Sequence, residues 1–280
     1  MKVFYKKELL QEHLAEITIR ASIGFIPTMG ALHKGHLSLI EKANNENDIS
    51  VVSIFVNPTQ FDKKEDLRSY PRTIEEDLAL LQTIKCDVVF VPSVSEIYDD
   101  NINALHFDFD GLEFEMEGKH RKGHFDGVGT IVKRFFEIVK PLKAYFGEKD
   151  FQQLQIIKKL VEKYRIPVQI IGCEIYREPD GLAMSSRNVR LTKAQRKEAP
   201  FIYKTLMKAK EKLKKDSIQT VIEWVEGEFK KNAVLQLEYF EIAHSKTLKP
   251  VRRKSKKASY RGFIAAFAGD IRLIDNIALN

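Results

Sequence analysis

Short apolar runs alternate along the first part of the chain with segments whose apolar residues recur at helical spacing. Five runs are apolar on consecutive residues and predict buried strands at 22–27, 49–57, 86–93, 143–148 and 168–173. The helical spacing predicts helices over 37–47, 74–84, 127–139 and 150–164. Strands that alternate with helices are typical of a doubly wound parallel sheet, so we expect an α/β domain over residues 1–174.

The pattern changes after residue 174. Helical stretches over 193–214 and 218–230 come before three strand-like runs at 235–244, 260–269 and 271–280. Helices followed by consecutive strands predict a smaller α+β domain over 175–280, with an antiparallel sheet.

Composition favours a globular cytoplasmic protein. The 280 residues are 44% apolar, which suffices for a substantial core. No apolar run approaches the ~18 residues of a membrane span, and the first residues lack the apolar core of a secretory signal. Cys86 and Cys173 have no metal-binding spacing, which is typical of buried, reduced thiols. We therefore expect no membrane partner.

The net charge of +7 is localised in one segment. Seven basic residues and no acid lie between 249 and 261, namely Lys249, Arg252, Arg253, Lys254, Lys256, Lys257 and Arg261. They account for the whole excess, so the rest of the chain is neutral. We interpret this basic cluster as a solvated hairpin loop and expect no nucleic-acid partner; an acidic or RNA partner is the alternative.

The sequence PTMGALHKGH (27–36) joins the first predicted strand to the first predicted helix. In an open parallel sheet, ligands bind at the carboxyl ends of strands, and a helix N-terminus attracts anions. Gly30 and Gly35 let the backbone approach a ligand, and His33 and His36 lie three residues apart on the first turn. The pattern predicts a phosphate site; a capping turn with incidental histidines is the alternative.

HxGH after the first strand resembles the nucleotidylyltransferase superfamily, which is related to class I aminoacyl-tRNA synthetases. The longer PTMGALHKGHLSLI resembles the pantothenate synthetase (pantoate–β-alanine ligase) family, and further matches lie at 53–61, 70–73, 118–132, 146–154, 177–188 and 271–276. The resemblance implies a Rossmann-like domain and a homodimer. It also implies ATP- and Mg²⁺-dependent condensation of (R)-pantoate with β-alanine through pantoyl adenylate, with release of AMP and pyrophosphate.

The resemblance also implies which residues line the ATP site: Met29, Gly30, Ala31, Leu32, His33, Lys34, Gly35, His36, Gly147, Glu148, Lys149, Asp150, Tyr176, Met184, Ser185, Ser186 and Arg187. Within this set we assign a catalytic role at the phosphates to His33, His36, Lys149, Ser185, Ser186 and Arg187. Asp150 suits the ribose hydroxyls. The segment MSSR (184–187) resembles the mobile KMSKS-type loop of the superfamily, but it lacks the lysines of that loop.

Gln60 and Gln153 are the candidate residues for binding pantoate, because an amide can donate hydrogen bonds to a carboxylate and can both donate to and accept from hydroxyl groups. Asn57, three residues before Gln60 in the sequence, is also predicted to bind the substrate. The charged span 61–73 is interpreted as a lid with Tyr70 near the substrate, and a plain surface loop is the alternative.

The sequence does not assign metal ligands. Glu76 and Asp77 are possible acids for Mg²⁺, but nothing in their spacing singles them out. His120 and His124 lie far along the chain from the HxGH pair and have no accompanying acid, so we expect no zinc site.

Two other functions are possible. One is a different nucleotidylyltransferase or a small tRNA-ligating enzyme, which the short length and localised charge disfavour. The other is a non-catalytic nucleotide-binding module, which the intact HxGH, Lys149 and MSSR elements disfavour.

Overall fold

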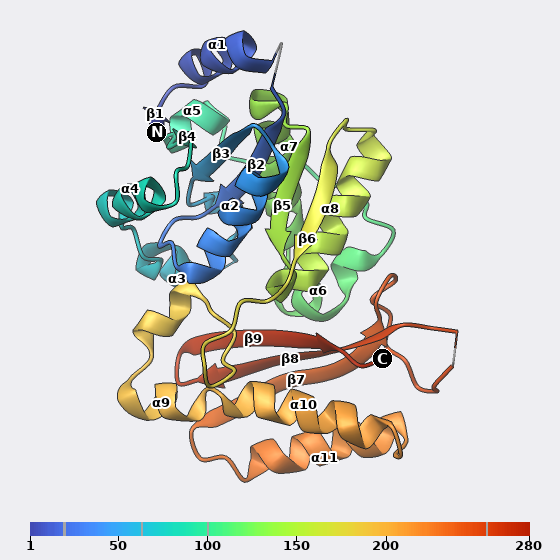
Figure 1. Ribbon diagram of the computed structural model, residues 1–280. Helices are drawn as coiled ribbons and strands as arrows, with labels where there is room; N and C mark the ends of the chain where they lie inside the picture. Colours follow the sequence, from blue (N-terminus) through green and yellow to red (C-terminus); the bar gives the residue numbers. More distant parts are fainter. Residues whose placement is uncertain (19–20, 63, 100, 256) are drawn as a thin grey trace. The chain divides into compact units, whose positions relative to one another are not determined.

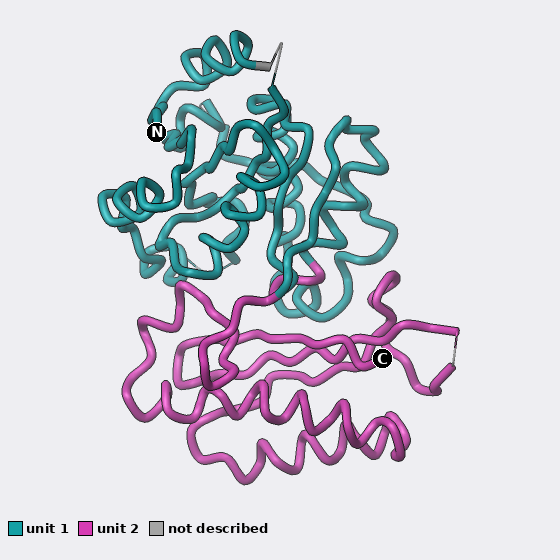
Figure 2. Tube along the Cα trace, in the orientation of Figure 1, with its two compact units in different colours: residues 1–148, 153–174 teal, residues 149–152, 175–280 magenta. Residues whose placement is uncertain are grey.

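The computed structural model of the protein describes residues 1–18, 21–62, 64–99, 101–255 and 257–280 (Figure 1). These residues form two compact units, shown in different colours in Figure 2. Unit 1 comprises 1–148 and 153–174, and unit 2 comprises 149–152 and 175–280. No helix in the described ranges is long and apolar enough to cross a bilayer.

Unit 1 is built on a six-stranded parallel sheet of order β1-β4-β3-β2-β5-β6. The strands are β1 (Lys2–Phe4), β2 (Ile23–Thr28), β3 (Ile49–Ile54), β4 (Val88–Phe90), β5 (Lys143–Gly147) and β6 (Gln169–Cys173). The order reverses between β2 and β5, which makes their carboxyl ends the switch point where α/β sheets bind ligands. The predicted parallel α/β sheet is confirmed, with β1 as an additional edge strand that the sequence analysis did not predict.

Eight helices accompany this sheet in the described sequence. They are α1 (Lys7–Thr18), α2 (Lys34–Glu46), α3 (Lys64–Ser69), α4 (Ile74–Thr83), α5 (Val94–Tyr98), α6 (Met116–His120), α7 (His124–Val139) and α8 (Phe151–Tyr164), with 3-10 turns η1 (Pro58–Gln60), η2 (Leu112–Phe114) and η3 (Glu148–Asp150). Helices α2 and α7 begin three residues earlier than predicted. The first turn of α2 has only polar residues and glycine, and that of α7 has a single apolar residue, Phe125, so neither shows an apolar spacing.

Consecutive residues of β2 show why helices cover both faces of the sheet. Ile26 belongs to a buried cluster with Leu39, Ile40 and Ala43 of α2. Phe25 points to the other face, where its ring meets Phe135 and Phe136 of α7 edge-on, with centroids 5.8 and 6.4 Å away. Side chains of a strand alternate between the two faces of the sheet, so two adjacent apolar residues are both buried only if helices pack on both faces.

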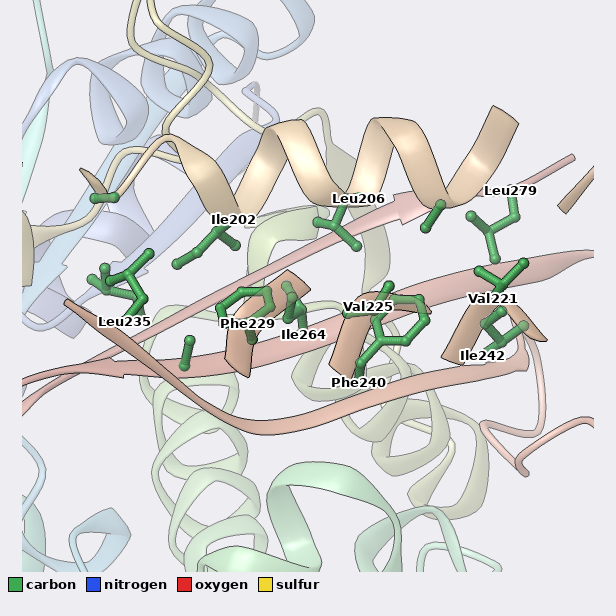
Figure 3. Close-up of a cluster of buried hydrophobic side chains, with 14 of the residues drawn as sticks. Ile202, Leu206, Val221, Val225, Phe229, Leu235, Phe240, Ile242, Ile264 and Leu279 are labelled. Carbon is green, nitrogen blue, oxygen red and sulfur yellow. The ribbon is translucent and has the colours of Figure 1, made fainter. Parts of the chain in front are cut away.

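Unit 2 carries an antiparallel sheet of order β7-β8-β9, as predicted. Its elements are η4 (Ser186–Arg190), α9 (Lys193–Glu198), α10 (Phe201–Leu213), α11 (Ile218–Lys230), β7 (Leu235–His244), β8 (Tyr260–Ala268) and β9 (Ile271–Ala278). Figure 3 shows apolar side chains of α10 and α11 meeting those of the strands in a cluster that includes Leu206, Val225 and Phe240.

The single helix predicted over 193–214 is wrong in one respect, because the segment forms two helices. Pro200 lies between them and has no N–H to donate to a preceding turn. Apolar spacing continues across this position, which is why the pattern alone predicted one helix.

Six of the seven residues of the basic cluster lie on the connection between the antiparallel neighbours β7 and β8, so the predicted hairpin loop is observed, whereas Arg261 lies in β8. Arg252, Arg253 and Lys257 are exposed, whereas Lys256 lies outside the described residues. Lys254 has a defined partner: its Nζ donates to the carbonyls of Leu213 (2.8 Å) and Asp216 (2.9 Å) after α10. A cation there also complements the negative end of the helix dipole.

Candidate active site

The turn between β2 and α2 needs glycine at position 30. Gly30 and Ala31 have φ values of 78° and 49°, in the left-handed region. A β-carbon on Gly30 would lie 3.0 Å from both Asp77 Oδ2 and Ile54 Cγ2. Conformation and space therefore both disfavour a side chain at Gly30, and the chain turns tightly from the strand end into the helix.

His33 and His36 interlock at the start of α2. His33 is the N-cap residue, and its Nδ1 accepts the N–H of Gly35 at 3.1 Å. In return, Nδ1 of His36 accepts the N–H of His33 at 3.3 Å, which completes a capping box. The rings stack with centroids 4.0 Å apart. Because each Nδ1 accepts a backbone hydrogen, the neutral rings carry their own hydrogen on Nε2.

Asp77 fixes the same turn from α4. Its carboxylate accepts the N–H groups of Ala31 (2.9 Å) and Leu32 (2.7 Å), and the hydroxyl of Thr73 at 3.3 Å. Burial raises the pKa of Asp77 above its usual value, while the two backbone N–H groups act in the opposite sense. Glu76 is exposed, so the two acids that the sequence could not distinguish have different environments.

Gln60 lies in η1, directly after β3, the neighbour of β2 in the sheet. Its side chain is buried and held at both ends of the amide. Oε1 accepts from Asn57 Nδ2 at 3.2 Å, and Nε2 donates to the Met29 sulfur at 2.8 Å. The structure therefore places Gln60 against a residue of the predicted ATP site, and it fixes which end of the amide faces Met29.

Asn57 is buried and uses its whole amide within the protein. Nδ2 also donates to the Gly127 carbonyl at 3.0 Å, while Oδ1 accepts from the hydroxyls of Tyr98 (2.6 Å) and Thr59 (3.2 Å). Contact between Asn57 and pantoate stays a prediction. The observed contacts make Asn57 the residue that orients Gln60.

The first turn of α7 supports η1. Nδ1 of His124 lies 2.8 Å from the Gln60 carbonyl, and its Nε2 lies 3.1 Å from Arg121 Nη1. Since arginine can only donate, Nε2 accepts and Nδ1 donates. At Gly127 a β-carbon would lie 2.3 Å from the Thr59 carbonyl oxygen, so only glycine lets α7 approach η1 this closely.

The other predicted pantoate residues, Gln153 and Tyr70, lie on segments that follow β5 and η1. Gln153 is half-buried on the first turn of α8, which follows β5, and β5 pairs with β2. The span 61–73 contains helix α3, and Lys63 within it lies outside the described residues. Tyr70 at the end of α3 is buried, with its ring edge-on to Phe61 at 5.7 Å. A lid role for this span stays a prediction.

Lys149 and Asp150 belong to unit 2, within a segment 149–152 that has residues of unit 1 on both sides along the chain. Lys149 Nζ lies 3.7 Å from Asp150 Oδ2. The Lys149 carbonyl accepts Asn276 Nδ2 at 2.9 Å, and Phe151 packs against Phe263 with ring centroids 6.0 Å apart. This short segment is thus attached to the antiparallel sheet.

The segment 176–187 also belongs to unit 2. It folds back on itself through the bridge between Arg177 and Ala183, and the Met184 N–H donates to the Tyr176 carbonyl at 3.0 Å. Ser185 is the N-cap of η4, and its Oγ accepts the Arg187 N–H at 3.3 Å. The hydroxyl of Ser185 therefore keeps a hydrogen that can be donated, as a phosphate-binding serine requires.

The predicted residues divide between the two units. Unit 1 holds residues 29–36 of the HxGH turn, Gly147, Glu148, Asn57, Gln60, Tyr70 and Gln153. Unit 2 holds Lys149, Asp150, Tyr176, Met184, Ser185, Ser186 and Arg187. In each unit most of these residues lie on turns and helix starts. In unit 1 the N–H groups of Ala31, Leu32, His33 and Gly35 already donate within the turn.

No three histidine, cysteine, aspartate or glutamate side chains within the described ranges are arranged to hold a metal ion. The carboxylate oxygens of Asp77 accept hydrogen bonds from backbone N–H groups and from a hydroxyl. Asp77 therefore stabilises the backbone of the turn. His120 is exposed, whereas His124 is buried beneath Gln60.

The chain is similar to proteins of one family over its whole length. A family model described as pantoate-beta-alanine ligase matches residues 2–278. A pantothenate synthetase of Christiangramia forsetii is 55% identical over 282 residues, which cover 100% of both chains.

Two solved structures also match. A pantothenate synthetase of Thermus thermophilus has a TM-score of 0.92 and 39% identity, over 100% of this chain and 99% of the other. A pantoate-beta-alanine ligase of Francisella tularensis, complexed with beta-gamma ATP and beta-alanine, has a TM-score of 0.81 and 35% identity, over 100% and 98%.

Proposed function

The chain belongs to the pantoate–β-alanine ligase family, and we propose that it joins (R)-pantoate to β-alanine with consumption of ATP, as a step of pantothenate biosynthesis. The observation that carries the proposal is the His33–His36 capping box at the switch point of the parallel sheet, where both neutral imidazoles carry a hydrogen on Nε2. The Francisella tularensis relative, complexed with beta-gamma ATP and beta-alanine, supports the substrate assignment.

The first step forms pantoyl adenylate. A carboxylate oxygen of pantoate attacks the α-phosphorus of ATP, the bond to the bridging oxygen breaks, and pyrophosphate leaves. Negative charge grows on the phosphoryl oxygens in this transition state, so preorganised donors accelerate the step. The donors of unit 1 are the imidazoles of His33 and His36, which lie at the positive end of the α2 dipole. Those of unit 2 are Lys149, Ser185, Ser186 and Arg187.

The second step forms the amide. The neutral amine of β-alanine attacks the acyl carbon of the adenylate, the bond from carbon to the phosphate oxygen breaks, and AMP leaves with both electrons of that bond. The nitrogen gives up one proton. AMP is a stable anion, so this step depends less on stabilising phosphate charge and more on holding the amine and acyl carbon together.

Gln60 and Gln153 are assigned to pantoate. The amide of Gln60 is held by Asn57 and Met29, so its orientation is set before substrate arrives. Such preorganisation lowers the entropic cost of binding. Neutral amides also suit an anionic substrate whose carboxylate must remain nucleophilic. Asp150 is assigned to the ribose hydroxyls and the backbone of Tyr176 to the nucleotide.

Three further parts of the proposal rest on family resemblance. Mg²⁺ bound to ATP would neutralise phosphate charge, the protein would act as a homodimer, and it would work in the cytoplasm. Sedimentation equilibrium tests the dimer, and titration of Mg²⁺ against fixed ATP tests the metal requirement.

The deciding experiment measures AMP formation with ATP, pantoate and β-alanine, omitting each in turn. We expect AMP only with all three, and exchange of pyrophosphate into ATP with pantoate alone. AMP release that depends on tRNA, or that ignores β-alanine, would indicate a different nucleotidylyltransferase. Nucleotide binding without turnover would indicate a non-catalytic module.

A further inference from the structure

Strand β9 contains two adjacent buried polar residues, Asp275 and Asn276, which are 4% and 2% exposed. They end the segment IRLIDN (271–276), to which the proposed function assigns no role. Burying an aspartate and an asparagine side by side is costly unless their hydrogen bonds are satisfied, so their partners indicate what they do.

Asp275 holds Arg177. The two form a bidentate ion pair, with Nη1 to Oδ2 at 2.7 Å and Nη2 to Oδ1 at 2.9 Å. Arg177 Nη1 also donates to the Gly181 carbonyl at 3.0 Å, and its guanidinium stacks 3.8 Å from the ring centroid of Tyr203. Arg177 is therefore fixed in position, and with it the turn that ends in Met184.

Asn276 holds Lys149. Its Nδ2 donates to the Lys149 carbonyl at 2.9 Å, and its Oδ1 accepts from Arg261. The Arg261 guanidinium lies 3.9 Å from the ring centroid of Phe151. These contacts explain why residues 149–152 group with unit 2 instead of with the strand and helix on either side of them.

The two residues reach different segments because consecutive side chains of a strand point to opposite faces of the sheet. Asn276 pairs with Phe263 in the β8–β9 ladder and lies on the face that meets Phe151. Asp275 pairs with Ile264, whose side chain belongs to the core formed with α10 and α11. One dipeptide thus anchors two segments that lie far apart in the sequence.

We propose that Asp275 and Asn276 are positioning residues that hold Lys149 and the Met184–Arg187 segment at fixed positions relative to each other. The cations of Lys149 and Arg187 and the hydroxyls of Ser185 and Ser186 can then act together on the phosphates of ATP. The inference rests on the proposed function. Neither residue needs to touch the substrate. Displacing a catalytic group by about 1 Å can cost on the order of 10²-fold in rate, so the anchors need to be rigid.

Two variants test the proposal. Asn276→Asp keeps the oxygen that accepts from Arg261 but replaces the donor to the Lys149 carbonyl with a second oxygen. Arg177→Lys keeps the positive charge but loses the bidentate geometry. The control is Glu238→Gln, which removes the charge from a partly buried ion pair with Arg272 (2.6 Å) on the same sheet.

The assay is pantoate-dependent exchange of pyrophosphate into ATP, with thermal unfolding recorded for every variant. We expect kcat/KM for ATP to fall about 10-fold to 100-fold in both variants, with KM for ATP raised and KM for pantoate within about twofold. Loss of folded enzyme alone lowers kcat and cannot raise KM. Glu238→Gln should retain wild-type kinetics.

Exchange constants for both variants equal to those of Glu238→Gln would overturn the proposal. If Asn276→Asp does not fold, Arg177→Lys decides the matter. If the unaltered protein shows no pantoate-dependent exchange, the proposed function fails and the inference fails with it, whereas an active wild type with unaffected variants refutes the inference alone.

Discussion

His36 carries two separable tasks on its two ring nitrogens, and two substitutions distinguish them. Nδ1 accepts the His33 N–H in the capping box, so Nε2 carries the hydrogen that we assign to the phosphates. Asparagine places its side-chain oxygen near the position of Nδ1, whereas glutamine places its amide nitrogen near that of Nε2. His36→Asn therefore keeps the cap and removes the donor, and His36→Gln does the reverse.

Loss of the donor should lower the reaction rate, whereas loss of the cap should lower the stability of the protein. Loss of one preorganised donor to a developing oxyanion typically costs on the order of 10²–10³ in kcat, or about 2.7–4 kcal/mol. Loss of a capping interaction costs about 0.5–2 kcal/mol of stability, which corresponds to a fall in Tm of roughly 1–8 °C for a chain of this size. We expect His36→Asn to lose rate and keep its Tm, and His36→Gln to lose Tm and keep much of its rate.

The assay is the pre-steady-state burst of pantoyl adenylate from ATP and pantoate. The donor acts in the transition state, so the burst rate should fall more than the affinity for ATP. Supplying preformed pantoyl adenylate should restore most of the activity of His36→Asn. Ser38→Ala is the control, because it removes a hydrogen bond to the Gly35 carbonyl (2.8 Å) in the same helical turn. A normal burst rate in His36→Asn, with failure only at amide formation, would refute the assignment.

The remaining predictions concern the surroundings of this turn and the stability of unit 1. Gln60→Ala should raise KM for pantoate by the equivalent of about 1–3 kcal/mol and change KM for ATP far less; steady-state kinetics with each substrate varied provide the measurement, and equal effects on both contradict the assignment. Gly127→Ala should also raise KM for pantoate, because the new methyl group would displace the 3-10 turn that carries Gln60. The control is Gly227→Ala, where a β-carbon would have no atom within 4 Å. This control should leave KM unchanged and should keep or raise the stability of the protein. Asp77→Asn leaves one backbone N–H of the HxGH turn facing an amide hydrogen, so it should lower stability by about 1–3 kcal/mol and slow pyrophosphate exchange; a lower Tm with unchanged exchange would restrict Asp77 to stability. A hydrogen bond from the Lys7 N–H, in the first turn of α1, lowers the pKa of Glu96. The ionised Glu96 carboxylate therefore stabilises the fold above the unfolded-state pKa of about 4.3, and this stabilisation is lost as pH falls through the folded-state pKa. Glu96→Gln should make the free energy of unfolding less dependent on pH in that acid range, which urea titrations at several pH values would measure.

The sequence predicted the elements whose apolar pattern is long, and it missed those that depend on distant partners. Five of the six parallel strands and the three antiparallel ones were predicted because each lies within a longer apolar run of the sequence. Strand β1 (Lys2–Phe4) is very short, and it pairs with β4 at Val88–Phe90, far along the chain. A pattern this short is indistinguishable from a loop until its partner strand is known.

The candidate site shows the same limit. The HxGH turn, Gln60 and Lys149 lie on recognisable motifs, so their positions could be predicted. Asp77 could not be distinguished from Glu76, because its role arises from two N–H groups 45 and 46 residues away in the sequence. The close approach at Gly127 likewise depends on a backbone segment that only the folded chain brings near.

The position of Lys149 in unit 2 offers an explanation for the lack of lysines in the MSSR segment (184–187). A KMSKS-type loop brings its own lysines to the phosphates, whereas here Arg187 is the sole cation within residues 184–187. Lys149 belongs to the same compact unit although it follows a strand of the other one, and its carbonyl is tied to β9 through Asn276. In the proposed function, Lys149 would supply the charge that residues 184–187 lack.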